Sequence, residues 1–178
     1  MNETSLLHPA VREALSRLDL AFEVLACDES LADTAAFCEH YGIAHDEACN
    51  AIVISLKTTP RQYVVCLVRA DTRLDVNHKV SAALGVKRMS FAGAEETSEL
   101  TGMLIGGVTV FGLPPGVPLL IDQRVLERRS IIVGGGNRTS KIRLDPQLLL
   151  RVPEVRIADI ATPRESLPPH HEVGKLQR

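Results

Sequence analysis

The sequence has no apolar run close to the roughly 20 residues that a helix needs to cross a bilayer. Its first residues, MNETSLLHPAVREAL, are polar and acidic where a signal peptide needs an apolar stretch. Its four cysteines form no CxxC pair, so redox chemistry is not indicated. We therefore expect a cytoplasmic protein with reduced thiols and no contact with a membrane.

The stretch with Cys38, His40, His45 and Cys49 has metal-capable side chains. Cys38 and His40 are two residues apart on a predicted helix, so they face different sides, and Gly42 then interrupts the segment. We expect no metal site and no cofactor.

The chain has 178 residues, of which 45% are hydrophobic, and this suits one domain with a core of normal proportions. Its first 50 residues hold two basic and ten acidic side chains, whereas the remainder hold eighteen and twelve. The stretch 124–143 is the most basic and surrounds a run of glycines. Such clustering suits a polyanion, and the alternative is a solvated face that only maintains solubility.

Hydrophobic periodicity and capping residues predict helices and strands in alternation with direct strand connections. The predicted helices are 8–18, 33–41, 75–84 and 94–101, and the predicted strands are 21–26, 51–56, 63–68, 86–91, 117–121, 131–133 and 142–144. Strands 51–56 and 63–68 should form an antiparallel hairpin, because a short polar connection joins them. The fold class is therefore α+β with a mixed sheet. We place the domain at residues 1–155 and expect a loosely ordered tail over 156–178.

Two glycine clusters could carry chemistry, one at 105–112 and one at 133–140. Paired glycines let a ligand approach the backbone and expose N–H groups that can bind a carbonyl oxygen, an oxyanion or a phosphate. Arg138, beside the second cluster, adds a guanidinium that matches a phosphate. Glycine pairs also make ordinary turns, so these clusters alone do not establish a site.

The order of these segments resembles the YbaK/EbsC family, the editing domain associated with prolyl-tRNA synthetase. The resemblance extends over residues 20–152. It is carried by ADTRLD, ALGVK, ELTG, IGGVTVFGLP, PLLID, IVGGGNR and IRLDPQLL, which occur in this order along the chain.

The resemblance implies a single α/β domain with a curved, mostly antiparallel sheet and surrounding helices. It also implies hydrolysis of the ester that joins a wrong, small amino acid of the Cys, Ala or Pro type to tRNA. The aminoacylated 3′ end of tRNA would be the partner, with prolyl-tRNA synthetase a further candidate and a monomer or a homodimer both open. By match, the catalytic residues would be Gly106, Gly107, Val108, Thr109 and Asn50, and the substrate-binding residues Gly134, Gly135, Gly136, Arg138 and Phe111.

Asn50 departs from the family pattern, because members of the family usually carry a lysine at this position. An asparagine can donate a hydrogen bond but brings no charge, and a charge-assisted contact is worth about 1.5–3 kcal/mol. Val110 is a second departure, where the family often has proline. These departures leave an alternative open: a module that binds an aminoacyl-tRNA end or a small ligand without turnover.

Overall fold

The computed structural model describes residues 2–164 of the chain. Its helices are α1 (Pro9–Arg17), α2 (Thr34–Tyr41), α3 (Ser81–Leu84) and α4 (Ala94–Thr101), with a π-helical turn, η3 (Val76–Val80), directly before α3. Its strands are β1 (Glu23–Ala26), β2 (Cys49–Leu56), β3 (Gln62–Arg69), β4 (Thr72–Leu74), β5 (Met89–Phe91), β6 (Leu119–Asp122), β7 (Ile131–Gly134), β8 (Ser140–Leu144), β9 (Val155–Ala158) and β10 (Ala161–Pro163). Short 3-10 helices occupy Glu3–Leu6, Glu29–Leu31, Gln123–Glu127 and Pro146–Arg151.

The predicted helices are all present, and their ends follow the residues that predicted them. Gly42, Gly85 and Gly102 each end a helix in the left-handed conformation, with φ of 67°, 67° and 71°. Asp75 caps the predicted helix 75–84 by accepting a hydrogen bond from the His78 N–H. That helix differs from the prediction in one respect, because its first part is π-helical.

The strands form one five-stranded sheet in the order β5-β2-β3-β6-β9 and two smaller sheets, β1-β8-β7 and β10-β4. The hairpin of β2 and β3 is antiparallel as predicted, with Cys49 opposite Arg69 and Leu56 opposite Gln62. The β3-β6 and β6-β9 pairs are parallel, and the other five strand pairs are antiparallel. The predicted mixed and mostly antiparallel sheet is therefore confirmed.

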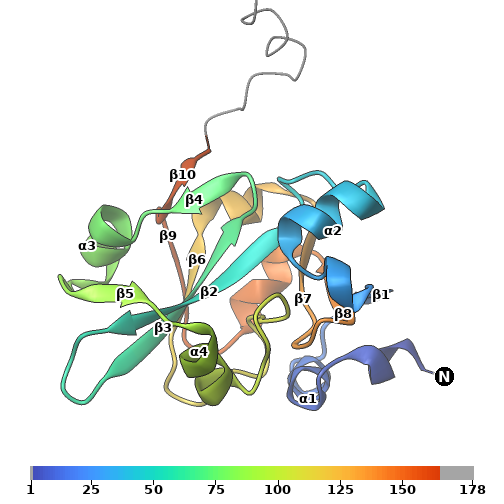
Figure 1. The fold of residues 1–178 in the computed structure, drawn as a ribbon, viewed down its shortest axis with the longest axis horizontal. Coiled ribbons are helices and arrows are strands. Elements are labelled where there is room, and N and C mark those ends of the chain that lie inside the picture. Colours follow the sequence, from blue (N-terminus) through green and yellow to red (C-terminus); the bar gives the residue numbers. More distant parts are fainter. Residues whose placement is uncertain (1, 165–178) are drawn as a thin grey trace, which may run out of the picture.

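The five-stranded sheet separates two hydrophobic cores, because alternate residues of β3 face opposite sides. Val65 and Leu67 pack into the larger core, which also holds α1 and the β1-β8-β7 sheet. Val64, Cys66 and Val68 face the smaller core under η3 and α3. Figure 1 shows the two smaller sheets at different borders of the five-stranded one.

The expected loose tail is wrong for residues 156–164. β9 adds to the edge of the large sheet beside β6, and β10 pairs with β4, with Ala161 opposite Leu74. The buried carboxylate of Asp122 holds the link between these strands by accepting the N–H groups of Ile160 and Ala161 at 2.9 and 3.0 Å. Two short strands with little apolar sequence are thus fixed by pairing and by one buried acid. Residues 165–178 of the expected tail lie outside the described residues.

None of the helices among residues 2–164 has the length and apolar character that a membrane span needs.

Candidate active site

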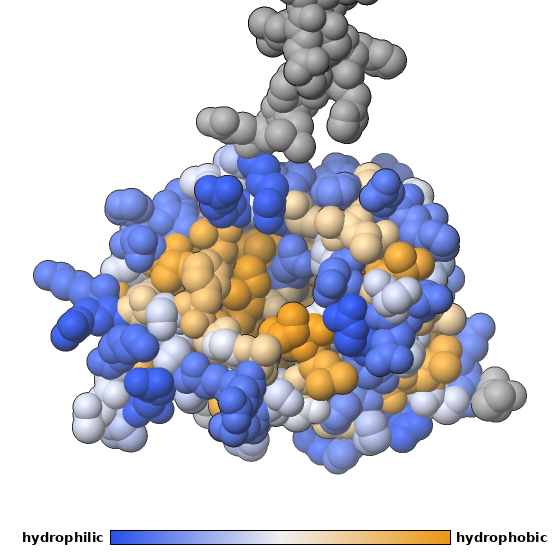
Figure 2. Space-filling model, viewed as in Figure 1, coloured by the Kyte–Doolittle hydropathy of each residue, from blue (hydrophilic) through white to orange (hydrophobic). Residues whose placement is uncertain are grey.

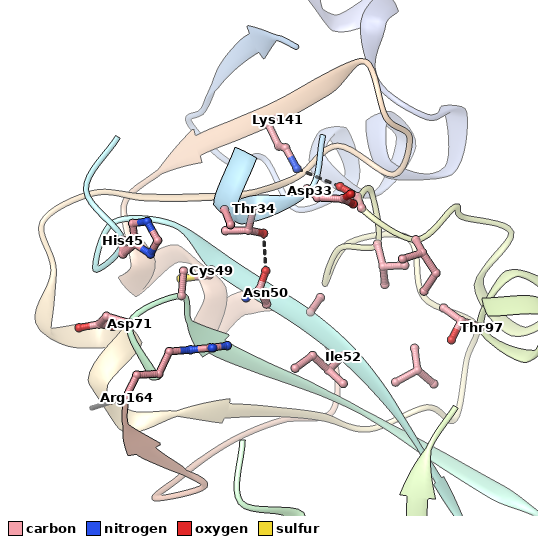
Figure 3. Close-up of a pocket in the computed structure, with 18 of the residues that line it drawn as sticks. Asp33, Thr34, His45, Cys49, Asn50, Ile52, Asp71, Thr97, Lys141 and Arg164 are labelled. Carbon is pink, nitrogen blue, oxygen red and sulfur yellow. Dashed lines mark hydrogen bonds between the residues drawn. The ribbon is translucent and has the colours of Figure 1, made fainter. Parts of the chain in front are cut away.

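A pocket of about 870 Å³ runs along the first half of β2. β2, the segment that leads into α2, the first glycine cluster and β8 all contribute to its walls. Figure 2 shows hydrophobic surface gathered in the middle of this face and rimmed by hydrophilic residues. The close-up in Figure 3 separates three parts of the pocket: His45, Asp71 and Arg164 at one end, Asn50, Thr34, Asp33 and Lys141 in the centre, and Ile52 and Thr97 at the other end.

Asn50 is the second residue of β2 and lies in the centre of the pocket. Its side-chain oxygen accepts a hydrogen bond from the Thr34 hydroxyl at the start of α2 (Figure 3). Because a carboxamide has one oxygen and one NH₂ group, this bond leaves the NH₂ group as the part of Asn50 that can donate to a ligand. A short, oriented and uncharged donor therefore occupies the position of the family lysine.

Lys141 supplies a cation in the same pocket and was not among the residues predicted for the site. Its side chain is only 5% exposed, and its Nζ donates to the carbonyl oxygens of Ala32 at 2.6 Å and Gly106 at 2.9 Å. Burial lowers the pKa of this ammonium, although the nearby Cys27 opposes the shift. The Nζ also lies 5.4 Å from the centre of the Phe37 ring. Lys141 thus joins α2, the glycine loop and the floor of the pocket.

Two carbonyl groups of the loop from Ile105 to Val108 are hydrogen-bonded to cationic side chains. Arg138 Nη1 donates to the Ile105 oxygen at 2.8 Å, while Lys141 holds the Gly106 oxygen. Gly106 and Val108 line the pocket, and their N–H groups have no acceptor among the described residues. These two amides are therefore the main-chain donors of the loop that can face a ligand.

Gly107 does not provide the free amide that we expected. Its N–H donates to the Leu104 oxygen at 2.9 Å, and its own oxygen accepts the Gly136 N–H at 2.7 Å. A β-carbon at Gly107 would lie 2.2 Å from the Asn137 oxygen. Gly107 is thus a glycine because two loops cross in direct contact, which is a packing requirement.

The second glycine cluster serves mainly to hold the first one. Gly134 lines the pocket, but the Gly135 N–H donates to the Ser140 oxygen, and Gly136 bonds to Gly107. Arg138 is not free to bind a phosphate, because its guanidinium contacts the Asp33 carboxylate at 3.0 Å and the oxygen of Glu29 at 3.2 Å, besides that of Ile105. Gly135, Gly136 and Arg138 therefore act here as structural residues.

The last two predicted residues lie away from the pocket. Thr109 is fully buried, and its hydroxyl has no partner among the described residues. Phe111 is 1% exposed and packs in the larger core, where it borders a separate apolar pocket of about 410 Å³ beside α1. Of the ten residues predicted for the site, the structure brings Asn50, Gly106, Val108 and Gly134 together in the 870 Å³ pocket.

The polar end of the pocket is formed by residues close to β4 and β10. Arg69 binds the Asp71 carboxylate through two bonds of 2.9 and 2.6 Å, and this bonding lowers the pKa of Asp71. Arg164 is anchored by its backbone N–H to the Asp71 oxygen and by its Nε to the Thr72 oxygen, both at 3.0 Å. Neither Nη of Arg164 has a partner among residues 2–164, so its guanidinium can still bind an anion (Figure 3).

The basic stretch 124–143 is not a free cationic surface. Four of its arginines pair with acids from other parts of the chain, and the pairs are Arg124 with Asp122 and Asp159, Arg128 with Asp46 and Glu47, Arg138 with Asp33, and Arg143 with Glu23. A sequence count could not show most of these pairs, because all of the acids except Asp122 lie far from their arginines along the chain. The polyanion interpretation of this stretch therefore loses its support.

The four cysteines are buried free thiols. Cys49 borders the pocket, but burial raises its pKa to about 12, so it is a thiol and not a nucleophilic thiolate at neutral pH. Among residues 2–164, no group of three or more His, Cys, Asp or Glu side chains is placed to hold a metal ion. The chemistry of the pocket itself is that of amide donors, one buried ammonium, one guanidinium, one imidazole and two carboxylates.

Comparison with known proteins identifies the kind of domain that carries this pocket. The model of the aminoacyl-tRNA editing domain matches residues 28–152, which is most of the chain and includes β2, both glycine clusters and Lys141. The chain belongs to the aminoacyl-tRNA editing domain family. The resemblance seen in the sequence is thereby confirmed, and the pocket lies within the matched editing domain except at Pro163 and Arg164.

Individual proteins and solved structures are also similar to this chain. A multifunctional Ser/Thr-tRNA deacylase, ProXp-y, of Escherichia coli K12 is 28% identical over 129 residues, which cover 72% of this chain and 76% of the relative. A solved structure described as a hypothetical protein has a TM-score of 0.77 at 25% identity and covers 86% of this chain and 99% of that one. A second, described as a candidate trans-editing enzyme for prolyl tRNA synthetase, has a TM-score of 0.75 at 24% identity and covers 88% and 99%.

Proposed function

We propose that this editing domain hydrolyses, in trans, the ester that joins a small, wrong amino acid to the terminal ribose of a tRNA. The observation that carries the proposal is the centre of the pocket, where the oriented NH₂ group of Asn50 and the amides of Gly106 and Val108 surround one space. Uncharged donors of this kind stabilise the negative charge that develops on an acyl oxygen. Such a reaction would take place in the cytoplasm, where tRNAs are charged.

The reaction needs only water as a co-reactant. The oxygen of water forms a bond to the acyl carbon, the ester bond to the ribose oxygen breaks, and a proton passes to that ribose oxygen. The resemblance to the family implies that the neighbouring ribose hydroxyl helps to position or activate this water. The protein then contributes positioning and charge stabilisation.

The three parts of the pocket match the three parts of an aminoacylated tRNA end. The apolar end, with Ala51, Ala92 and Val108, suits a small side chain. The centre suits the ester, and the polar end suits a phosphate of the terminal nucleotides, because the Nη groups of Arg164 have no partner among residues 2–164. The terminal nucleotides therefore run from Asn50 toward β10.

The amino acids that we propose are those with small side chains. Cys, Ala and Pro were expected from the resemblance, and the E. coli relative is named for Ser and Thr. Thr97 favours adding Ser and Thr, because it lines the pocket and its hydroxyl can exchange a hydrogen bond with a hydroxyl group of the substrate. A hydroxyl on the substrate would satisfy that group, and a site built for such a bond discriminates against analogues that lack it.

A deacylation assay with a panel of mischarged tRNAs tests the proposal. Asn50→Ala removes the central donor and should slow ester loss about tenfold, which corresponds to one hydrogen bond. Asn77→Ala is the matched control, because Asn77 is an exposed asparagine outside the pocket, and it should react at the wild-type rate. Ester loss no faster than spontaneous hydrolysis for every tRNA in the panel would contradict the proposal.

A second candidate is a module that binds a charged tRNA end without turnover, and the neutral Asn50 favours it. The positive charge of the family lysine is missing at this position, and Lys141 is already engaged with two carbonyl oxygens. Asn50→Lys distinguishes the candidates. If the wild type binds mischarged tRNA without hydrolysis and Asn50→Lys hydrolyses it, the module is the correct description. Binding to prolyl-tRNA synthetase is a separate prediction, tested by co-sedimentation of the two proteins.

A further inference from the structure

The first half of β2 has an open edge. β3 covers one edge of β2 over its full length, from Cys49 to Leu56. β5 covers the other edge only over Ile54–Leu56. β7 approaches this edge at the isolated parallel bridge of Ala48 with Ile132, and beyond it residues 50–53 have no strand partner on that edge among the described residues. Residues 49–53 line the 870 Å³ pocket. The pocket is thus bordered by a strand edge as well as by side chains.

The direction of each peptide group along this edge follows from strand geometry. In a strand, the N–H and C=O of one residue point to the same edge, and the direction alternates from residue to residue. The Val53 oxygen accepts the Ala92 N–H at 2.9 Å, and the Glu47 oxygen accepts the Ile132 N–H at 2.7 Å, both on the open side. Ala51 lies between Glu47 and Val53 at even spacing from both.

Ala51 therefore presents both its N–H and its C=O to the pocket. Neither group has a partner among residues 2–164, whereas Asn50 and Ile52 turn their peptide groups toward β3. Two anchored hydrogen bonds, one on each side of Ala51, keep this part of the edge in place. The result is one donor and one acceptor, held at the spacing of a strand and open to a ligand.

We propose that the edge at Ala51 holds the aminoacyl group as a one-residue added strand, an inference that rests on the proposed function. The Ala51 N–H donates to the acyl carbonyl oxygen, and the Ala51 C=O accepts from the substrate's α-ammonium. Two residues that face each other in an antiparallel pair exchange the same two bonds. The clamp therefore recognises the part that all aminoacyl esters share, and it adds a donor at the oxygen that becomes negative.

This geometry also determines where the amino-acid side chain goes. Residues that face each other across an antiparallel pair put their side chains on the same face, about 5 Å apart. Ala51 faces the larger core, beside Ala92 and Val108, which are pocket residues. An L-amino acid would place a small side chain there, whereas its D-isomer would direct the side chain to the opposite face. The clamp thus selects L-aminoacyl groups with small side chains.

Amide hydrogen exchange measured by NMR tests the clamp with the wild-type protein. The probe is an uncleavable analogue, 3′-seryl-amino-3′-deoxyadenosine, which keeps the carbonyl oxygen and the ammonium. At saturation it should slow exchange of the Ala51 amide at least about tenfold, because an open amide becomes hydrogen-bonded. The Ala70 amide, already bonded to the Ala48 oxygen at 2.8 Å, is the internal control and should not change. The D-seryl analogue should bind at least about tenfold more weakly, since it loses one bond or its side-chain site.

The outcomes separate the clamp from the function. If the analogue binds and mischarged tRNA is hydrolysed, but exchange of the Ala51 amide is unchanged, the clamp is wrong and the proposed function stands. If neither binding nor hydrolysis occurs, both are wrong. As a second measurement, Ala51→Pro removes only that N–H at an edge position that tolerates proline, and kcat should fall about 100-fold, as for the loss of an oxyanion donor. Ala51→Gly retains the N–H, so its kcat should fall much less than that of Ala51→Pro; an equal loss of kcat in both variants would also overturn the clamp.

Discussion

The contact between the two glycine loops makes Gly107→Ala a sharp test of the site's construction. A β-carbon at this position would lie 2.2 Å from the Asn137 oxygen and 2.4 Å from its carbonyl carbon, whereas ordinary contact begins at 3.4 Å. The loops would have to separate by about 1.2 Å (3.4 Å less 2.2 Å). Such a shift would break the 2.7 Å bond from the Gly136 N–H to the Gly107 oxygen.

The expected loss of unfolding free energy is about 3 kcal/mol, of which about 2 come from overpacking against the backbone and about 1 from the hydrogen bond. Gly102→Ala is the control, because a β-carbon there meets nothing within 4 Å and only the φ of 71° opposes alanine. That variant should lose about 1 kcal/mol. Urea unfolding followed by circular dichroism measures both variants, since the chain has no tryptophan. Equal losses in the two variants would show that the loops are not in tight contact.

Three further changes test the pocket. Lys141→Met should lower the unfolding free energy by about 2 kcal/mol in the same urea assay, because two carbonyl oxygens lose their donor; no loss would mean that the ammonium does not hold the loop. Thr97→Val should reduce the kcat/KM ratio of Ser-tRNA over Ala-tRNA about tenfold, and an unchanged ratio would remove Thr97 from specificity. Asp71→Asn should be less stable than the wild type only at pH values where the Asp71 carboxyl group of the folded wild type is ionised. The hydrogen bonds from Arg69 lower the pKa of Asp71 below 3.8, so its contribution is present above pH 3.8 and disappears as the pH falls through the folded-state pKa. A stability difference that does not shrink as the pH falls below 3.8 would contradict this assignment.

The parts of the fold that local chemistry determines could be predicted from the sequence. Gly42, Gly85 and Gly102 end helices in the left-handed conformation that glycine tolerates, and the Asp75 side chain caps the helix that follows it. The β2-β3 hairpin follows from two β-branched runs separated by a short polar connection. Each of these features depends on residues close to one another in the sequence.

β9 and β10 could not be predicted in the same way. Their sequences lack a strong apolar alternation, and they exist because β6 and β4 offer open edges and Asp122 accepts two of the linking amides. That acid lies 38 residues before Ile160. The error about the tail therefore came from judging order by local hydrophobicity alone.

Only part of the site could be predicted from the sequence, because the rest depends on contacts between residues far apart along the chain. The glycine clusters do meet at the pocket, but which N–H groups remain free depends on how loops 30 residues apart contact each other, as the Gly136 to Gly107 bond shows. Lys141 was counted only as part of a basic stretch. Its position directly before the strand predicted at 142–144 was the one sequence signal that its side chain could be buried.

The structure of the protein bound to the uncleavable 3′-seryl-amino-3′-deoxyadenosine tests the central claim most directly. The account predicts the aminoacyl group along the edge of β2, with its carbonyl oxygen near the Asn50 NH₂ group, and the adenosine toward Arg164. The analogue in the apolar pocket beside α1, or with its seryl group at the Arg164 end, would contradict the account.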